Sequence, residues 1–292
     1  MKKFTAILMV FAMLFSFAAC KDNSKDEGEG MTNPYVTGVN GEAVTNEQGE
    51  SVTIVSGEST TQASSDAEDT TAATEMTVPS EDPSTWTKEQ IVEFYKNAAI
   101  SSKTKVKSIE YKNLEEMVVN DGDGVLGTFV EWATPFLVKA LEDSQVEFDG
   151  ITGGYENLVP EDVQSAKAYK SGEGIVVEMT MKEQTDGIHG DRYSGTVGHA
   201  ISVVGDISSV EEALAKWFEI DFENGKISLR YTKPTLKVKI NKDGVVEKGT
   251  WSYTIKINVS NLKIAAVRLP IEVMVDKAHG TVGYVINVGG GF

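Results

Sequence analysis

The chain has 292 residues, of which 44 are acidic and 27 basic, so its formal net charge at pH 7 is −17. This balance argues against a nucleic-acid-binding protein, because such proteins need a basic surface to meet the phosphate backbone. The single cysteine, Cys20, excludes a disulfide framework and zinc sites built from cysteine pairs.

Residues 1–19 are predicted to be an export signal. Two lysines precede an apolar run, and the small residues Ala18 and Ala19 lead to Cys20. Residues 4–19 number 16, fewer than the ~20 that a membrane-spanning helix needs. A small-residue cleavage site followed by cysteine resembles the bacterial lipobox, although Phe17 stands where an aliphatic residue is usual. The alternative is an ordinary secretory signal with a cysteine nearby.

Lipidation explains why an exported chain carries one unpaired cysteine. In the resembling lipoproteins this cysteine carries a diacylglyceryl group, and two acyl chains make a lasting anchor where one does not. The predicted partner of Cys20 is therefore membrane lipid, and the predicted location is the extracytoplasmic face of the cell membrane.

Residues 20–85 are predicted to form a disordered, lipid-anchored stalk. From residue 21 to residue 85 there are 14 acidic and two basic side chains, and from residue 51 onward 15 of 35 residues are Ser or Thr. A segment of this composition has too little apolar surface to offset the entropy cost of ordering its backbone. Val-Thr pairs recur every eight residues at 36, 44 and 52, a repeat too short for a solenoid. A weak β-hairpin is the alternative there.

The segment from residue 86 to residue 292 is long enough to form a folded domain. The first elements of this domain are predicted to be helices. Thr87 and Gln90 have capping-box spacing and precede a helical stripe that ends near Ser101. A second, almost wholly apolar stripe runs from Leu126 to Leu141. Short helices are predicted at Pro160–Lys167 and at Val210–Phe218.

The C-terminal part alternates apolar and polar residues with a period of two, which predicts strands. The alternation covers Ile227–Tyr231, Leu236–Ile240, Trp251–Val259, Ile271–Val275 and Val282–Val288, and Ile175–Met181 adds an earlier strand. Short turns favour antiparallel pairing with one face buried. The predicted fold class is α+β: a curved antiparallel sheet with helices packed on one face, preceded by the disordered stalk.

Several segments resemble uncharacterised surface lipoproteins of Gram-positive bacteria, a group with no assigned activity. They are the Ala18-Ala19-Cys20 end of the signal, the acidic Ser/Thr-rich stalk, the domain opening at Trp86–Val92, the strand Gly249–Thr254 and the end Gly289–Phe292. The layout alone is also similar to lipoprotein lipid carriers with a helix-covered half-barrel sheet.

No motif predicts an enzyme or a cofactor. The histidines, His189, His199 and His279, form no metalloprotease spacing. A hydrolase centred near His189, with Asp191, Ser194 and His199 as its triad, is a distant hypothesis. The stretch Gln184–Gly195, which holds all of these residues except His199, is instead predicted to be a polar loop between strands. The stretch Asn120–Gly124 lacks the ligands of an EF-hand and is predicted to be a turn.

Two binding hypotheses remain. One is a basic outward face of the sheet, formed by Arg230, Lys237, Lys239 and Lys256, that meets an anionic cell-wall polymer or lipid headgroups. The alternative is a solvated face whose lysines prevent strand aggregation.

The other hypothesis is an apolar ligand pocket under the 126–141 helix, lined by Leu126, Phe129, Val130, Ala133 and Leu137. The alternative is plain core packing. Trp86, Trp217 and Trp251 are interpreted as packing residues rather than as a sugar platform. The predicted function is a non-enzymatic binding or structural domain at the cell envelope, and a carrier or sensor of a lipid-like ligand is the alternative.

Overall fold

The computed structural model describes residues 82–120, 145–215, 218–267 and 272–292, all within one compact unit. The predicted signal sequence, most of the predicted stalk and the predicted helix at 126–141 lie outside the described residues.

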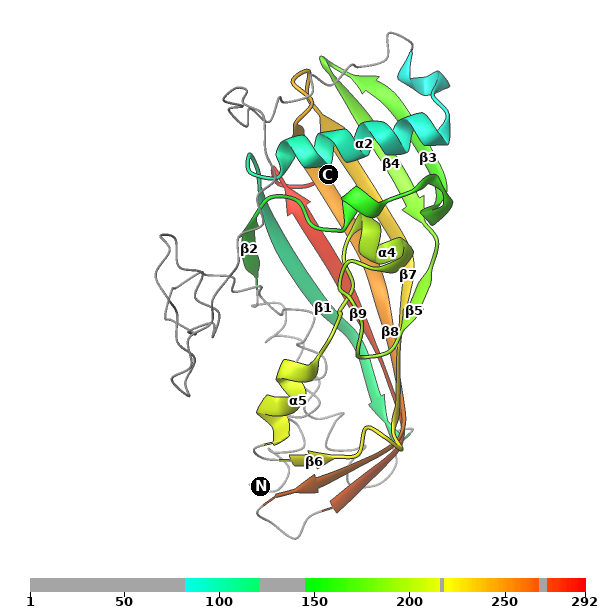
Figure 1. Cartoon of the computed structure of the whole chain (residues 1–292), viewed down its shortest axis with the longest axis vertical. Coiled ribbons are helices and arrows are strands. Elements are labelled where there is room, and N and C mark those ends of the chain that lie inside the picture. Colours follow the sequence, from blue (N-terminus) through cyan, green and yellow to red (C-terminus); the bar gives the residue numbers. More distant parts are fainter. Residues whose placement is uncertain (1–81, 121–144, 216–217, 268–271) are drawn as a thin grey trace, which may run out of the picture. The chain divides into compact units, whose positions relative to one another are not determined.

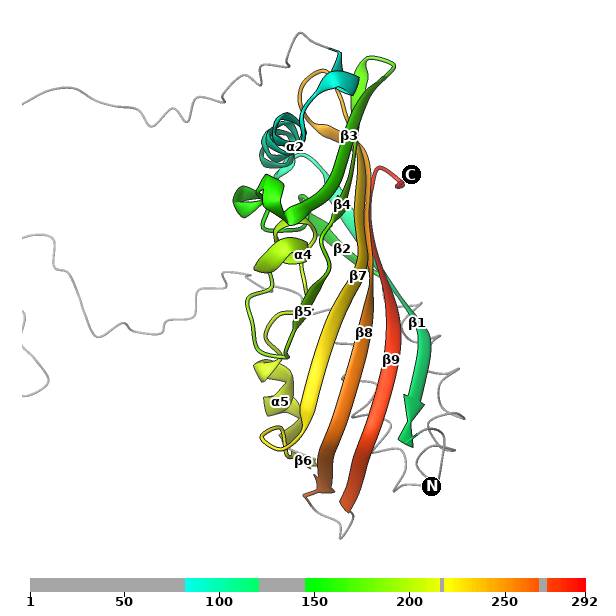
Figure 2. The same cartoon turned by 90° about the vertical axis from the view of Figure 1, so that its right-hand side faces the viewer.

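One antiparallel sheet dominates this unit. Its main path has the order β2-β1-β9-β8-β7-β4-β3, with β5 paired to β7 and β6 paired to β8. The strands are β1 (Lys107–Val119), β2 (Val146–Asp149), β3 (Val163–Ser171), β4 (Gly174–Met181), β5 (Gln184–Asp186), β6 (Phe218–Ile220), β7 (Lys226–Ile240), β8 (Val246–Ala266) and β9 (Glu272–Val288). The sheet is open and curved, and its long central strands β7, β8 and β9 pair antiparallel in succession (Figures 1 and 2).

The helices lie on one side of the sheet (Figure 2). They are α2 (Lys88–Ser102), α4 (Gly195–Ala200) and α5 (Ser208–Ala215), with short 3-10 helices η2 (Pro83–Thr85), η4 (Tyr155–Asn157) and η5 (Pro160–Asp162). We call the side of the sheet that faces α2 and α4 the inner face, and the opposite side the outer face. The predicted α+β class, with helices on one face of a curved antiparallel sheet, is confirmed.

The inner face holds the apolar half of each alternating strand. In β8, Trp251, Tyr253 and Ile255 are buried, while the residues between them are more exposed. In β7 the buried residues change parity between Tyr231 and Leu236, and a bulge between Thr232 and Thr235 absorbs the extra residue. The bulge therefore keeps both halves of this strand facing the same core.

Helix α2 begins where its capping box predicts. The side chain of Thr87 accepts from the Gln90 N–H, and the Gln90 side chain accepts from the Thr87 N–H. The buried stripe of the helix meets the sheet, where the indole N–H of Trp251 donates to the hydroxyl of Tyr95 at 2.9 Å. At the other end, Ser102 accepts the backbone N–H of Val246 at 2.8 Å. Both contacts fasten α2 to β8.

Three local predictions were wrong in part. Pro160–Lys167 is not a helix, because only η5 forms there and the chain then pairs with β4 as strand β3. Gln184–Gly195 is not loop throughout, because its first three residues pair with β7 as β5 and Gly195 begins α4. The two strands predicted at 271–275 and 282–288 belong to one strand, β9.

Candidate functional site

Cross-strand pairing sorts the outer-face side chains into rows, because directly paired residues share a face. One row is rich in hydroxyl groups and crosses β3, β4, β7 and β8 as Ser165, Thr180, Thr235 and Ser252. The row beside it crosses five strands as Lys167, Glu178, Lys237, Thr250 and Asn287. The outer face is therefore lined by hydrogen-bonding groups from strands far apart in the sequence.

These rows border an open groove of about 510 Å³. Its lining residues are Ser165, Ala166, Lys167, Glu178, Met179, Thr180, Thr235, Leu236, Lys237, Thr250, Ser252 and Phe292. The hydroxyl oxygens of Thr235 and Ser252 lie 3.1 Å apart, and Thr250 donates to the amide oxygen of Asn287 at 2.8 Å. Four strands and the last residue of the chain thus build one surface.

Glu178 is the electrostatic centre of this groove. Its carboxylate lies 2.6 Å from the ammonium of Lys167 and 3.1 Å from that of Lys237, and it accepts from the hydroxyl of Tyr169 at 2.9 Å. The pKa of Glu178 is lowered to about 2, mainly because Lys167 donates a hydrogen bond to its carboxylate. The same carboxylate raises the pKa of Lys237 by accepting a hydrogen bond from it. Glu178 is therefore a fixed anion between two cations.

Phe292 adds an exposed ring to the groove. Its centroid lies 4.7 Å from the ammonium of Lys237 and 5.1 Å from that of Lys248, and the residue is 51% exposed. The preceding glycines place it there: Gly289, Gly290 and Gly291 all have positive φ, so the chain turns back after β9. The backbone N–H of Phe292 then donates to Thr250 at 2.9 Å. Figure 2 shows this end of the chain on the outer face.

The four predicted basic residues lie on the outer face, but most of their charge is balanced. Lys237 pairs with Glu178, Lys239 with Glu247 at 2.9 Å, and Arg230 with Glu183 at 2.6 Å. Lys256 lies opposite Arg230 in the register and is exposed. The predicted stripe is therefore a face of alternating charge.

A second polar cluster is buried on the inner face of the sheet. Glu110 lies 2.6 Å from the ammonium of Lys112, accepts from the hydroxyl of Tyr284 at 2.5 Å and lies 3.8 Å from Arg192. The rings of Tyr284 and Tyr253 stack at 4.6 Å. Burial raises the pKa of both tyrosines, so their hydroxyls stay protonated. The cluster connects β1 and β9 to the loop that carries Arg192.

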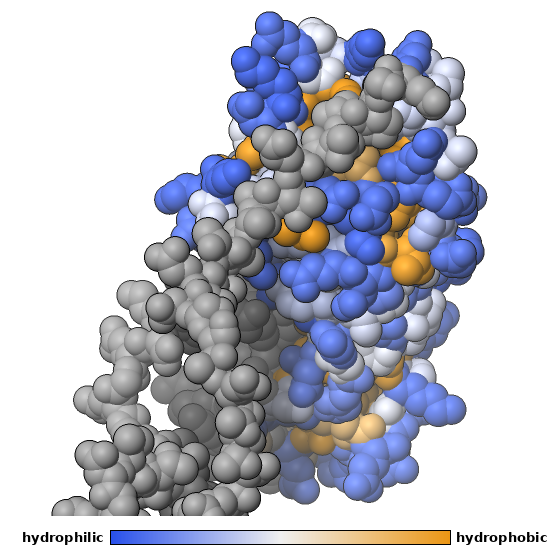
Figure 3. Space-filling model, turned by 45° about the horizontal axis from the view of Figure 1, so that its top comes forward, coloured by the Kyte–Doolittle hydropathy of each residue, from blue (hydrophilic) through white to orange (hydrophobic). Residues whose placement is uncertain are grey.

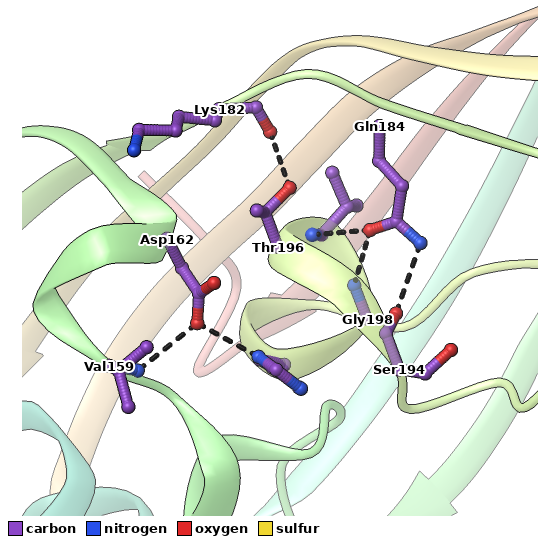
Figure 4. A network of polar contacts seen from close by, with 9 residues as sticks. Val159, Asp162, Lys182, Gln184, Ser194, Thr196 and Gly198 are labelled. Carbon is purple, nitrogen blue, oxygen red and sulfur yellow. Dashed lines mark hydrogen bonds and ion pairs between the residues drawn. The ribbon is translucent and has the colours of Figure 1, made fainter.

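A third network fixes helix α4, as Figure 4 shows. The side chain of Gln184 accepts from the N–H groups of Val197 and Gly198 and donates to the carbonyl of Ser194. On the other side, His199 Nδ1 lies 2.8 Å from a carboxylate oxygen of Asp162, which also accepts from a backbone N–H of the turn before η5. A glutamine from β5 thus provides the cap that Ser194 does not.

The hypothetical hydrolase residues do not assemble. Ser194 donates to the backbone oxygen of Asp191, whereas His199 pairs with Asp162 instead. His189 contacts Asp206 at 3.1 Å and Glu211 at 3.4 Å. Within the described ranges, no group of three or more His, Cys, Asp or Glu side chains could hold a metal ion.

The first residue of the predicted turn at 120–124 has a structural role. The amide oxygen of Asn120 accepts from the backbone N–H groups of Asp276 and Lys277 at 3.1 and 3.3 Å. It therefore ties the end of β1 to β9, and the rest of that turn lies outside the described residues.

The two remaining sets of predicted site residues fall in parts of the chain that the structure leaves undescribed: Cys20, and the pocket residues Leu126, Phe129, Val130, Ala133 and Leu137. Trp86 and Trp251 are buried, as expected for packing residues, and Trp217 is also undescribed. Of the helices described, none has the length and apolar content to cross a membrane.

The described part of the helical side that is visible in Figure 3 carries separate apolar spots. Figure 3 shows this side as mainly hydrophilic, with several hydrophobic spots between charged residues. Ile100 at the end of α2 is 49% exposed, and Val159 before η5 is 41% exposed. Exposed apolar residues that stand singly are normal and need no partner to cover them. Among the described surfaces we therefore take the groove of the outer face as the candidate site.

Sequence reasoning found one lysine of this groove, Lys237, but not Lys167, Glu178, the hydroxyl row or Phe292. Two signals were available: Ser and Thr alternate with apolar residues in the strands, and three consecutive glycines precede the last aromatic residue. Comparison of the chain with protein-family models, curated protein sequences and solved structures finds no match. Its resemblance to surface lipoproteins therefore stays a prediction, and function must be argued from the chain itself.

Proposed function

We propose that the protein is a lipid-anchored, extracytoplasmic binding protein whose domain binds a component of the cell envelope through the outer face of its sheet. The observation that carries this proposal is the contrast between the two faces of one sheet. Helices cover and fill the inner face, whereas the outer face carries two rows of hydrogen-bonding side chains around an open groove.

The groups in the groove suit binding better than catalysis. Lys167 and Lys237 both face the carboxylate of Glu178, whose pKa of about 2 keeps it ionised and makes it a poor proton donor or acceptor near neutral pH. The surrounding hydroxyls of Thr235 and Ser252 already contact each other. Such groups are suited to positioning a ligand, which supports the non-enzymatic role that we propose.

The location is supported by the sequence. A charged start, an apolar run and Ala18-Ala19-Cys20 favour lipidation of Cys20. We expect the like charges of the acidic stalk to repel one another and to extend it. In this arrangement the domain is held away from the bilayer, at the level of the cell wall.

Two experiments with the full-length protein test the proposal. In cell fractionation, Cys20→Ser should move the protein from the membrane fraction to the medium or leave it unprocessed. Unchanged, detergent-dependent retention in the membrane would contradict the anchor.

The second experiment is co-sedimentation of the detergent-solubilised protein with isolated cell envelopes. Lys237→Ala, on the outer face, should weaken binding at least threefold, because the lysine borders the groove. The matched control is Lys96→Ala, on α2 at the opposite side of the sheet. Equal binding by both variants, or no binding by the native chain, would refute the outer face as the binding surface.

A further inference from the structure

The groove combines three features that together define a ligand class. First, Phe292 presents a half-exposed aromatic ring that is held close to two ammonium groups rather than buried. An aromatic face carries partial negative charge, so it attracts the weakly positive C–H groups of a ring-shaped ligand. Second, Ser165, Thr180, Thr235 and Ser252 line up beside it as hydroxyl donors and acceptors.

Third, the groove has a modest positive charge: its lining holds two lysines and one carboxylate, and Lys248 lies beside Phe292. Lys167 and Lys237 share one carboxylate, Glu178, at 2.6 and 3.1 Å, and Lys239 beside them pairs with Glu247. A polymer of repeated phosphates would have to compete with these carboxylates, whereas a polyhydroxyl ligand can accept from the lysines and donate to Glu178 without breaking the pairs. This modest charge favours a neutral or weakly anionic ligand over a polymer of repeated phosphates.

We infer that this groove binds a polysaccharide, with one sugar ring packed on Phe292 and its hydroxyl groups bonded to Glu178, Lys237 and the hydroxyl row. This inference rests on the proposed function and names the ligand of the same surface. The row crosses four neighbouring strands, three spacings that span about 14 Å. That length suits a chain of several sugar units better than a single sugar.

Gly291 is the positioning residue for the aromatic ring. Its φ is +70°, and a Cβ at this position would lie 2.4 Å from the amide oxygen of Asn287 and 2.9 Å from the Thr250 hydroxyl. Gly291→Ala should therefore displace Phe292 from the groove while leaving the ring in the protein. This variant tests where the ring is placed, and Phe292→Ala tests the ring itself.

The experiment measures co-sedimentation of the full-length, detergent-solubilised protein with insoluble polysaccharides at low and high salt. The probes are cellulose, chitin and bacterial peptidoglycan stripped of its phosphate polymers, with peptidoglycan that retains those polymers alongside. The native chain should bind at least one stripped polysaccharide, with an affinity that changes less than threefold between the two salt concentrations. Phe292→Ala should weaken that binding at least tenfold, and Gly291→Ala should weaken it at least threefold.

Ile100→Ala is the matched control, because Ile100 is 49% exposed on the helical side, similar to Phe292. Its binding should equal that of the native chain, and near-equal melting temperatures of all variants verify that they are folded. Binding only to the phosphate-bearing wall, lost at high salt and unchanged in Phe292→Ala, would overturn the polysaccharide and leave the proposed function standing. If the native chain bound envelopes but none of these probes, the polysaccharide inference alone would fall; if it did not bind envelopes either, both would fall.

Discussion

The two faces of the sheet are built from the same strands, but the inner face forms the core and the outer face forms the candidate binding surface. On the inner face, Trp251, Tyr253 and Tyr284 are buried against helices and one another. On the outer face, the sequence neighbours of Trp251 and Tyr253 are Thr250, Ser252 and Thr254, which remain partly exposed. Because side chains alternate along a strand, every second residue serves folding and the others are free to serve binding. Inner-face changes should alter stability, and outer-face changes should alter binding.

The largest expected effect is on the inner face. Trp251→Ala removes a fully buried indole and its hydrogen bond to Tyr95, so it should lower the free energy of unfolding by about 4 kcal/mol. Chemical denaturation followed by circular dichroism measures this loss. As a control that keeps the packing, Tyr95→Phe removes only the acceptor of the indole N–H and should cost about 1–3 kcal/mol. A loss below 1 kcal/mol for Trp251→Ala would mean that the inner face is not the core.

The buried ion pair on the inner face should be the next largest effect. Glu110→Ala removes the carboxylate that lies 2.6 Å from Lys112 and accepts from Tyr284, and both side chains of the pair are almost fully buried. We expect a loss of about 3 kcal/mol, because a buried cation then loses its nearest countercharge. The double variant Glu110→Leu/Lys112→Met should be more stable than the single one. If Glu110→Ala unfolded at the same denaturant concentration as the native chain, the cluster would have no structural role.

Strands β7 and β8 and helix α2 could be predicted from the sequence, because each shows its pattern within a few consecutive residues. The period of two in β7 and β8 and the capping box of α2 depend on residues close together, and both predictions were right. Strand β1 carries Glu110 and Lys112 toward the core, so its alternation is not apolar and was missed. Helix α4 was missed because its cap comes from Gln184, ten residues before Ser194.

The groove was harder to anticipate than the fold. Glu178 and Lys237 are 59 residues apart in the numbering and meet only through the β4–β7 register. Phe292 reaches Lys237 only because three glycines in the left-handed region turn the chain back after β9. A one-residue change in strand register would place these side chains on the opposite face, so periodicity alone could not bring them together.

Acid should probe the outer face through Glu178. Its folded-state pKa of about 2 lies below 4.5, the ordinary value for a glutamate side chain, so the native state favours the ionised form. The stabilising contribution is therefore complete above about pH 4.5 and is lost as the pH falls toward 2. The difference in melting temperature between the native chain and Glu178→Gln should shrink across that interval. A difference that is constant from pH 6 to pH 2 would contradict the ion-pair role of Glu178.

The smallest expected effect lies at the exposed end of the outer face, where Arg230 pairs with Glu183. The two side chains are 57% and 44% exposed, and water and salt screen an exposed pair even at a separation of 2.6 Å. Arg230→Ala should lower the free energy of unfolding by less than about 1 kcal/mol. Its loss should become smaller still in high salt, unlike the loss from Glu110→Ala, because water and ions do not reach the buried pair. Urea denaturation of both variants at two salt concentrations makes the contrast measurable. A salt-independent loss above 2 kcal/mol at Arg230 would show that the outer face also holds the fold together, and the division between the two faces would fail.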